Sequence, residues 1–593
     1  MSQKAKYDPL LFKLPKGAIT KGQEVTFSIE YYDDVRPNQV CFMVKADGDD
    51  FYRYLPMKKT QNGYKISHVF NEKGHFWYNF QFVYEEYCEY LNRTPDNYSF
   101  VSSEKQDDFL QLVTEEEYNC TNSMQGGIIY QIFVDRFCKV GNPVQREPLV
   151  LREDWGGAIK KNTDDPVKLN LEVFGGNIQG IISKLDYIKG LGVTTIYLSP
   201  VSQASSNHKY NTSNYMMIDS MFGTEQDFKQ LVETAKQKGM GIVIDGVYNH
   251  TGSDSVYFDK ESKFENHGAF ENRDSRFYDW YEFEDYPNKY RCWWGIDTLP
   301  SINRNSADFQ NYIAGKGGVL EKFLKLGVRG VRLDVVDEIT DQFVKKIEKK
   351  VHEFNENNVI LGEVWEDVST KISYDERRKY FVDNELNSAM NYPIKESVLK
   401  YIFTKNSDEL ISTIRMIENS YPKVVRDNLM NFLTTHDTRR VFSELLSHYD
   451  GNYDMALRAY KIAMILVFTL PGVPSIFYGD EYGMQDNDGS SRNCFDWKGY
   501  DNDIYKWVTK LTKIRQLPVL KDGEINVLYS ANGKFAFERY DDDERLIVIA
   551  NLSDSPFDIN LEGDFESFFT GKQIKNHTVD PNDFDIIYEA KKD

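Results

Sequence analysis

Residues 194–200 read TTIYLSP, residues 222–239 read FGTEQDFKQLVETAKQKG and residues 241–247 read GIVIDGV. The first and third segments are short, nearly continuous apolar runs, which are typical of strands buried on both faces of a parallel sheet. The segment between them has the spacing of an amphipathic helix. Together the three segments predict a strand–helix–strand unit.

Further apolar runs continue this alternation over residues 123–512. They are GIIYQIFV (127–134), GVRLDV (330–335), NVILGEVW (358–365), LMNFLTT (429–435) and VPSIFYG (473–479), with a weaker candidate at 387–391. Eight strands alternating with helical stretches predict an α/β fold, a closed (β/α)8 TIM barrel. A doubly wound open sheet is the structural alternative.

An irregular stretch interrupts this pattern after the third strand. Residues from about 250 to 310 carry many Tyr, Trp, Asp and Asn side chains and little periodicity. We expect an inserted subdomain there.

The two ends of the chain have a different pattern. Residues 1–122 contain short aromatic and β-branched runs such as EVTFSIEYY (24–32), which predict an N-terminal β-sandwich. Residues 513–593 contain KFAFERYD and RLIVIANLS with hairpin turn signals between them. They predict a C-terminal antiparallel β domain, assigned as a second sandwich.

Charge and composition exclude several classes of protein. The formal net charge of −21 disfavours nucleic acid and anionic membranes as partners. No apolar stretch is long enough to span a bilayer, and the first residues lack the apolar segment of a signal peptide, so a cytoplasmic location is expected. Six cysteines without a CxxC pair argue against a zinc site and a disulfide scaffold.

Polar side chains end four of the expected strands. The residues are Asp245 and His250, Arg332 and Asp334, Glu363, and His436 with Asp437. A single acid in such a place is usually the N-cap of the next helix. Because the carboxyl ends of barrel strands meet at one mouth, so many charged residues at equivalent positions predict a catalytic cluster.

The residue types narrow the chemistry of this cluster. The sequence has no Gly-rich phosphate loop and no GxSxG elbow, and its two histidines lack a third ligand at zinc spacing. Glycoside cleavage needs one carboxylate to attack the anomeric carbon and one acid to protonate the leaving oxygen. Carboxylates and an arginine in an aromatic-rich cleft suit that reaction.

Four segments carry a resemblance to a known family. DGVYNH (245–250), GVRLDVVDE (330–338), GEVW (362–365) and FLTTHD (432–437) resemble, in order and spacing, the signature regions of the α-amylase superfamily. YQIFVDRF, NHKYNTSNY and GVPSIFYGDEYGM are similar to its supporting motifs. The N-terminal β domain and YRCWWGIDTLPSIN (290–303) resemble the neopullulanase, cyclomaltodextrinase and amylopullulanase branch.

The resemblance implies three catalytic carboxylates. Asp334 would be the nucleophile, Glu363 the general acid/base, and Asp437 the third carboxylate, which binds sugar hydroxyls and helps to distort the ring. We expect Arg332 to keep Asp334 ionised by lowering its pKa. Retaining geometry predicts that the carboxyl groups of Asp334 and Glu363 lie roughly 5–5.5 Å apart.

The same resemblance implies a set of substrate-binding residues. They are Tyr210, Asp245, His250, Arg332, His436 and Arg492. Tyr210 would stack on the sugar before the cleaved bond, to which His250 and His436 would donate, unless Tyr210 is a core aromatic. Asp245 would contact sugar or support the barrel mouth. Arg492 would reach the far end of the cleft or form a surface ion pair.

Departures from the family pattern bear on cofactors. Asn211 follows HKY where the family usually has Asp, and the loop FCKVGNP (137–143) with FGGN (174–177) lacks the acids of a calcium site. We expect no required cofactor and no metal ligand, with at most a weak structural Ca²⁺ site at Asn142 and Asn177. Trp293 and Trp294 would line distal subsites or pack the inserted subdomain.

The predicted function is a retaining α-glucan hydrolase. Its expected substrates are maltooligosaccharides, pullulan, cyclodextrins or starch, cleaved at α-1,4 and also α-1,6 bonds. A glucanotransferase or phosphorylase is the first alternative, and a non-catalytic glucan-binding protein is the second. The N-terminal domain has three open roles: glucan binding, formation of a homodimer that covers the cleft, or support of the barrel.

Overall fold

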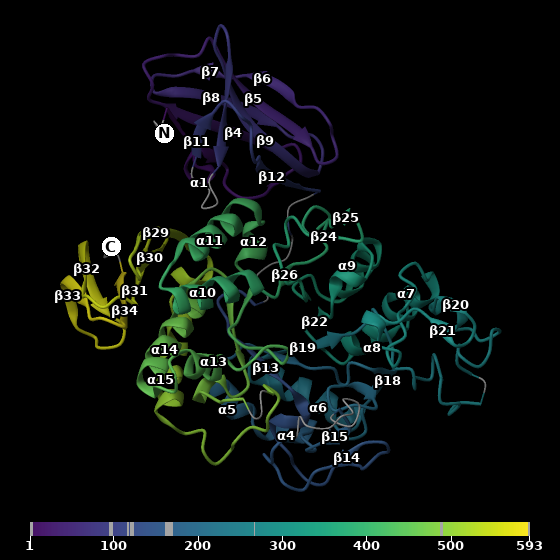
Figure 1. The fold of residues 1–593 in the computed structure, drawn as a ribbon. Helices are drawn as coiled ribbons and strands as arrows, with labels where there is room; N and C mark the ends of the chain where they lie inside the picture. The colour runs from purple at the N-terminus through teal and green to yellow at the C-terminus, as the bar shows by residue number, and fades with distance from the viewer. Residues whose placement is uncertain are drawn as a thin grey trace.

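A closed ring of eight parallel strands lies at the centre of the computed structural model, which describes residues 4–93, 99–115, 118, 124–159, 170–265, 267–486 and 490–590 (Figure 1). The strands are β13 (Ile129–Ile132), β16 (Thr195–Leu198), β19 (Gly241–Gly246), β22 (Gly330–Leu333), β23 (Val359–Gly362), β26 (Ser388–Ala389), β27 (Met430–Asn431) and β28 (Val473–Phe477). Strands that follow one another in the chain are neighbours in the sheet, and β28 pairs with β13. A parallel bridge between Met390 and Met430 joins β26 to β27, so the predicted closed barrel is confirmed and the open sheet is excluded.

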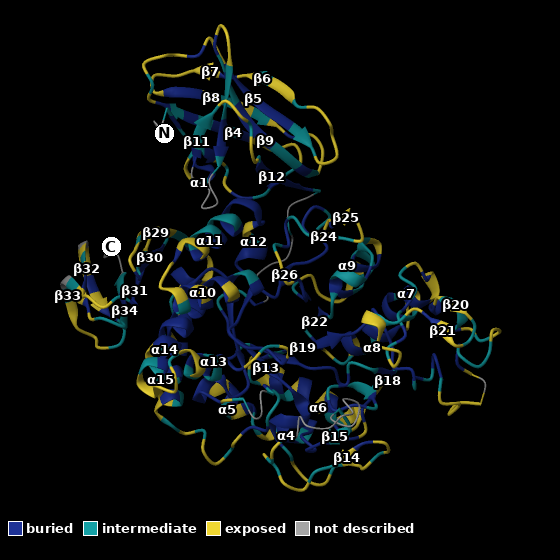
Figure 2. Cartoon of the chain, viewed as in Figure 1, coloured by how far each residue is buried: buried dark blue, intermediate teal, exposed yellow. Residues whose placement is uncertain are grey.

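Burial on both faces explains the continuous apolar runs. Every residue of β13, β16, β22, β23 and β28 is buried (Figure 2). One cluster of side chains, among them Tyr197, Leu361 and Phe432, forms a compact core of strand residues, while a larger cluster packs strands against helices. Because neither face of these strands meets solvent, they lack the alternation of apolar and polar residues that is typical of a half-exposed strand.

Helices surround the ring. They are α4 (Ile178–Ser183), α5 (Leu185–Gly190), α6 (Glu225–Gln237), α8 (Val319–Lys325), α9 (Asp341–Phe354), α10 (Tyr392–Thr404), α11 (Asp408–Ser420), α13 (Val441–His448), α14 (Tyr453–Thr469) and α15 (Asp503–Thr512). The Thr224 side chain and Asp227 form a capping box that starts α6, and Thr340 caps α9. Among the described helices, none combines the length and apolar character that a membrane crossing requires.

The inserted subdomain follows β19, as predicted. It contains β20 (Phe283–Asp285), β21 (Lys289–Tyr290) and the 3₁₀ turns η1 (Tyr278–Trp280) and η2 (Trp293–Gly295), and leads into α7 (Ala307–Ala314). Aromatic rings of Tyr257 and Trp280 pack against one another there at 5.1 Å between centroids. An antiparallel bridge between His250 and Ser301 returns the insertion to the barrel mouth.

Two sheets pack face to face in the N-terminal domain. The first contains β1 (Ala5–Lys6), β2 (Lys13–Leu14), β4 (Glu24–Tyr31), β7 (Lys58–Lys59) and β8 (Gly63–Val69), and the second β3 (Ile19–Thr20), β5 (Gln39–Ala46), β6 (Arg53–Pro56), β9 (Gly74–Val83), β10 (Cys88–Arg93), β11 (Ser99–Ser102) and β12 (Phe109–Thr114). Alternate residues of β4 are buried against Phe42 and Tyr78 of the facing sheet. The predicted sandwich is confirmed, although β3 and β12 pair in parallel. The domain boundary expected at residue 122 lies outside the described residues.

The C-terminal domain is one antiparallel sheet that folds over itself. Its order is β29 (Glu524–Ala531), β30 (Lys534–Tyr540), β31 (Glu544–Asn551), β34 (Asp583–Ala590), β32 (Phe557–Ser567) and β33 (Gln573–Val579). β32 pairs with β34 only at its end, after a break in register beside Gly563, whose φ of +139° suits glycine. The first half of β32 therefore packs Phe557 over Ile547 and Ile549. Packing resembles the expected sandwich, but the hydrogen bonds form a single sheet.

A buried lysine, Lys13, contacts α11 from the N-terminal sandwich; the sandwich and α11 adjoin in Figure 1. Lys13 is fully buried, and its ammonium donates to the carbonyl oxygens of Gly17 at 3.1 Å and Asn419 at 3.3 Å. Burial lowers the pKa of Lys13 to about 7 from 10.5. Charging this amine in the folded protein therefore opposes stability.

Replacing Lys13 by Met should give a stability difference that depends on pH. Between pH 7 and 10.5 the unfolded chain binds a proton at Lys13 that the folded chain does not, so the free energy of unfolding of the wild type rises with pH there. The melting temperature of Lys13→Met relative to wild type should be highest at pH 7 or below and decline toward pH 10. Thermal unfolding across this range measures it. Lys16→Met, an exposed neighbour, is the matched control, and a pH-independent difference for Lys13→Met would refute the assignment.

Candidate active site

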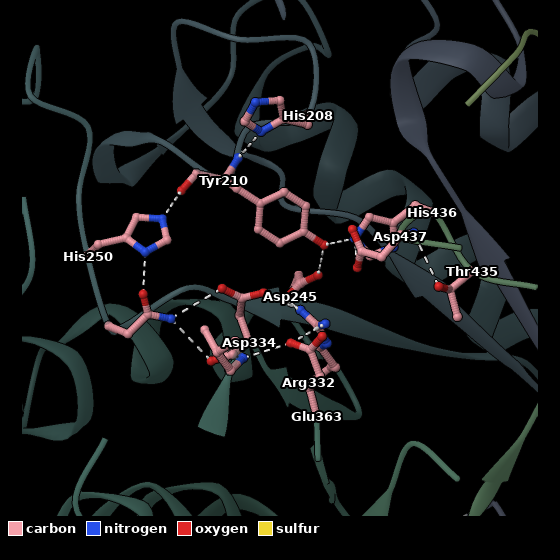
Figure 3. Close-up of polar contacts among 12 residues, drawn as sticks. His208, Tyr210, Asp245, His250, Arg332, Asp334, Glu363, Thr435, His436 and Asp437 are labelled. Atoms are coloured by element: carbon pink, nitrogen blue, oxygen red, sulfur yellow. Dashed lines mark hydrogen bonds and ion pairs between the residues drawn. The ribbon is translucent and has the colours of Figure 1, made fainter. Parts of the chain in front are cut away.

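Four carboxylates gather at the carboxyl ends of neighbouring barrel strands (Figure 3). Asp245 lies in β19, Asp334 directly follows β22, Glu363 directly follows β23, and Asp437 lies beyond β27. Their order in the barrel brings side chains from distant parts of the sequence to one mouth. The predicted cluster is therefore present as one structural unit.

The guanidinium of Arg332 joins three of these acids. Its Nη1 donates to Asp245 Oδ1 and to Asp334 Oδ1, each at 2.8 Å. Its Nη2 lies 2.7 Å from Glu363 Oε2, a close ion pair whose angle falls outside that of a hydrogen bond. Arg332 is fully buried, so its charge is balanced by these carboxylates and not by water.

Glu363 is held by donors from two sides. Its Oε2 accepts the backbone N–H of Val335 at 2.8 Å, and its Oε1 accepts the indole N–H of Trp365 at 3.1 Å. Val335 has φ 36° and ψ 58°, a left-handed conformation that is strained for a β-branched residue. This strain, at the residue after Asp334, points its N–H at Glu363.

Asp334 has fewer donors. Besides Arg332, the amide of Asn249 lies 3.3 Å from its Oδ2. Burial raises the pKa of Asp334 well above its ordinary value; Arg332 acts in the opposite direction, and Glu363 and Asp245 add to the rise. The expectation that Arg332 keeps this pKa low is therefore wrong in net direction, because desolvation and neighbouring acids outweigh the one cation.

Asp437 has the opposite electrostatic environment. His436 Nε2 lies 3.0 Å from its Oδ2, and Arg492 Nη2 donates to its Oδ1 at 3.1 Å. Burial acts to raise the pKa of Asp437, but His436 and Arg492 outweigh it and hold that pKa below its usual range. Arg492 also donates to the carbonyl of His436, so it braces the third carboxylate itself.

Tyr210 is half-buried and faces this side of the cluster. Its ring stacks on His436 at 5.2 Å with an interplanar angle of 8°, and its hydroxyl donates to Asp245 Oδ2 at 2.8 Å. The structure therefore does not support the alternative that Tyr210 is a core aromatic. Gln131 Nε2 lies 3.0 Å from His436 Nδ1, and with the amide donating there the ring proton sits on Nε2, facing Asp437 and Tyr210.

Two residues predicted to contact sugar, Asp245 and His250, hold the framework of the mouth in this structure, and their contact with sugar stays a prediction. The Asp245 side chain is completely buried and accepts from Arg332, Tyr197 and Tyr210. His250 is also buried, with its nitrogens facing Asn249 and the carbonyl of Tyr210, and burial lowers its pKa to about 4. A neutral His250 without a free nitrogen positions Tyr210 and Asn249.

Some contributors were not singled out in the sequence. Asn249 ends the same strand segment as Asp245, and Tyr197 places a hydroxyl at the end of an otherwise apolar run, so both positions carried a signal. Trp365 stood inside GEVW, but nothing in that motif shows where its indole N–H points.

A hollow lies beside the acid cluster, which it reaches through Asn249, the residue that contacts Asp334. It has a volume of about 180 Å³, and its lining includes Asn249, Trp293, Trp294, Arg304 and Glu338. Trp294 is 76% exposed, so its ring is presented to solvent, and it stacks on the half-buried ring of Trp293 with centroids 5.4 Å apart. Both tryptophans therefore line the region beside the acids.

The residues named for a weak calcium site have other contacts. Asn177 caps α4 through its Oδ1 and donates from Nδ2 to the carbonyl of Val140. Within the described ranges, no three His, Cys, Asp or Glu side chains are grouped as metal ligands. Calcium binding at Asn142 and Asn177 stays a prediction.

Several known proteins are similar to this chain. The chain is 29% identical to an amylopullulanase of Thermoanaerobacter thermohydrosulfuricus over 93% of the chain and 42% of that protein. It is 32% identical to a cyclomaltodextrinase of Thermoanaerobacter pseudethanolicus, over 72% of the chain and 70% of the relative. The chain spans less than half the length of the amylopullulanases that it matches at 28–29% identity.

A solved structure shares the whole architecture. The type III pullulan hydrolase of Thermococcus kodakarensis superimposes with a TM-score of 0.69 at 22% identity, covering 99% of this chain and 100% of the other. Residues 131–516, which hold all four carboxylates, match the α-amylase catalytic domain. The chain belongs to the α-amylase family of glycoside hydrolases.

Proposed function

We propose that this protein is a retaining α-glucan hydrolase, with Asp334 as nucleophile and Glu363 as general acid/base. The observation that carries the proposal is the bridging of both carboxyl groups by one guanidinium, that of Arg332. Retaining glycosidases place the two groups roughly 5–5.5 Å apart, and inverting ones roughly 6.5–9.5 Å apart to admit a water. A shared guanidinium supports the shorter arrangement.

The proposed reaction has two steps. Asp334 Oδ attacks the anomeric carbon while Glu363 gives its proton to the departing glycosidic oxygen, which leaves as a sugar hydroxyl. Glu363, now a carboxylate, then takes a proton from water, whose oxygen displaces Asp334 from the anomeric carbon. Asp437, 31% exposed at its side chain, has room to bind sugar hydroxyls beside the stacked rings of Tyr210 and His436.

Asp334 must be ionised to attack, while burial raises its pKa. One carboxyl group of the cluster must carry the proton that is given to the leaving group. The first step requires that proton on Glu363. Substrate binding must therefore favour the pair Asp334 carboxylate and Glu363 carboxylic acid.

The proposed substrates are maltooligosaccharides, cyclodextrins and pullulan. Relatives named cyclomaltodextrinase and neopullulanase, at 28–32% identity over 72–73% of this chain, support this range. A glucanotransferase uses the same intermediate and passes it to a sugar; Trp294 beside the acids offers a surface for such an acceptor. The cytoplasmic location and a homodimer stay predictions.

Replacing Asp334 by Asn should remove activity and leave the fold intact. The amide keeps the shape but cannot form the ester, so kcat should fall by roughly 10³-fold or more. Initial rates on maltoheptaose measure the loss, and circular dichroism with the melting temperature checks the fold. An activated fluorosugar that forms the ester faster than water removes it should label Asp334 in the wild type, as peptide mass spectrometry would show. Unchanged turnover, or a label on another residue, would disprove the nucleophile assignment.

Hydrolysis and transfer should be separable by product analysis. With maltoheptaose as substrate, a hydrolase gives only shorter products, whereas a transferase gives products longer than seven units. Digestion of pullulan then identifies the cleaved bond, because panose, maltotriose and isopanose arise from different cuts. If products longer than the substrate predominate at low substrate concentration, the protein is a transferase and not a hydrolase.

A further inference from the structure

Trp365 is anchored on one face and bonded to the proposed acid/base. Its ring stacks on buried Tyr392 with centroids 4.0 Å apart and an interplanar angle of 16°. Its indole N–H donates to Glu363 Oε1 at 3.1 Å. Trp365 is 46% exposed, so the other face of its ring is open to solvent.

The two oxygens of Glu363 are not equivalent. Oε2 accepts from Val335 N–H and lies against Arg332 Nη2, so two fixed donors already face it. Trp365 is the hydrogen-bond partner of Oε1 among the described residues. An acid proton on Oε2 would meet these donors, so the proton that Glu363 gives to a leaving group belongs on Oε1.

An indole N–H can only donate, and a carboxylate oxygen accepts such a bond more strongly than the oxygen of a protonated carboxyl group does. The contact seen here therefore fits Glu363 as a carboxylate. A hydrogen bond to the charged form of an acid favours that form. Trp365 thus acts on the oxygen through which the proton must pass in both steps.

We propose that Trp365 is a positioning residue that sets the protonation state of Glu363, its N–H stabilising the carboxylate at Oε1. The inference rests on the proposed function of Glu363 as acid/base. The bond lowers the population of the acid form with which the first step begins. It also stabilises the carboxylate that the first step leaves behind and that the second step uses as its base.

Other charged and titratable groups face Glu363 and stay in place when Trp365 is changed. They are Tyr197 of β16, Arg332 and Asp334 of the β22 segment and Tyr392 of α10, while Asp245 and Asp437 act on the neighbouring Asp334. A Trp365→Phe substitution keeps the stacking on Tyr392 and removes one donor. Any change in Glu363 titration is then attributable to that N–H.

The pH dependence of kcat/KM of Trp365→Phe tests the proposal. Without the donor the acid form persists to higher pH, so the alkaline limb on maltoheptaose should move up by about one pH unit, a roughly tenfold change in the ratio of the two forms. On an aryl maltoside whose leaving group needs no proton, the shift should vanish. An unmoved limb on maltoheptaose, or an equal shift on both substrates, would overturn the proposal. Lack of wild-type activity on every glucan would instead refute the proposed function.

A second measurement needs no turnover. In ¹⁵N spectra the indole resonance that is missing from Trp365→Phe identifies Trp365 in the wild type. It should shift with pH as Glu363 titrates and stay constant in Glu363→Gln. A resonance that ignores pH in the wild type, or titrates equally in Glu363→Gln, would show that the indole does not sense Glu363. Trp294→Phe is the matched control, since Trp294 does not contact Glu363.

Discussion

The mouth of the barrel depends on one buried cation, Arg332. Its guanidinium contacts carboxylates from three adjacent strand ends, Asp245, Asp334 and Glu363, and no water reaches it. Removing one partner of a buried ion pair typically costs about 3–5 kcal/mol, since the remaining charges are left uncompensated. These contacts form only if β19, β22 and β23 are neighbours in parallel register. The order of strands in the barrel and the acid cluster therefore depend on each other.

Arg332 alone does not neutralise all the carboxylates of the mouth, and the acids that remain differ in the cations beside them. Asp437 has His436 and Arg492 beside it and keeps a low pKa, whereas buried Asp334 has a raised pKa. The pKa values of two carboxyl groups in one mouth are thereby shifted in opposite directions. Such a difference allows a single site to hold an acid and a carboxylate at one pH. Glu363 has donors of its own, the N–H groups of Val335 and Trp365.

Much of this arrangement could be predicted from sequence because strand ends are marked by residue type. Asp245, Asp334 and Glu363 each end an apolar run, and even the two-residue strand β26 lies within the weak candidate at 387–391. Properties that depend on how deeply a side chain is buried, such as its pKa, could not be predicted. Arg332, two residues before Asp334, indicated a low pKa for Asp334. The sequence does not show the burial that raises this pKa instead. Likewise Asp245 and His250 sit where sugar contacts are expected, and only the coordinates show their polar atoms already bonded to Tyr197, Asn249 and Tyr210.

The N-terminal sandwich contributes to the same mouth through one segment of the barrel. The residues that follow Glu363 carry Ser369, whose carbonyl contacts His75 at 2.8 Å, and Arg377, which donates to Asp47 at 2.7 Å. Within that segment Lys371 lies 3.0 Å from Asp337, three residues after Asp334. The segment is therefore bound by the sandwich on one side and by the nucleophile's own loop on the other. Of the three roles open to the sandwich, support of the barrel has a physical basis in these contacts, and glucan binding or dimerisation would have to use surfaces that they leave free.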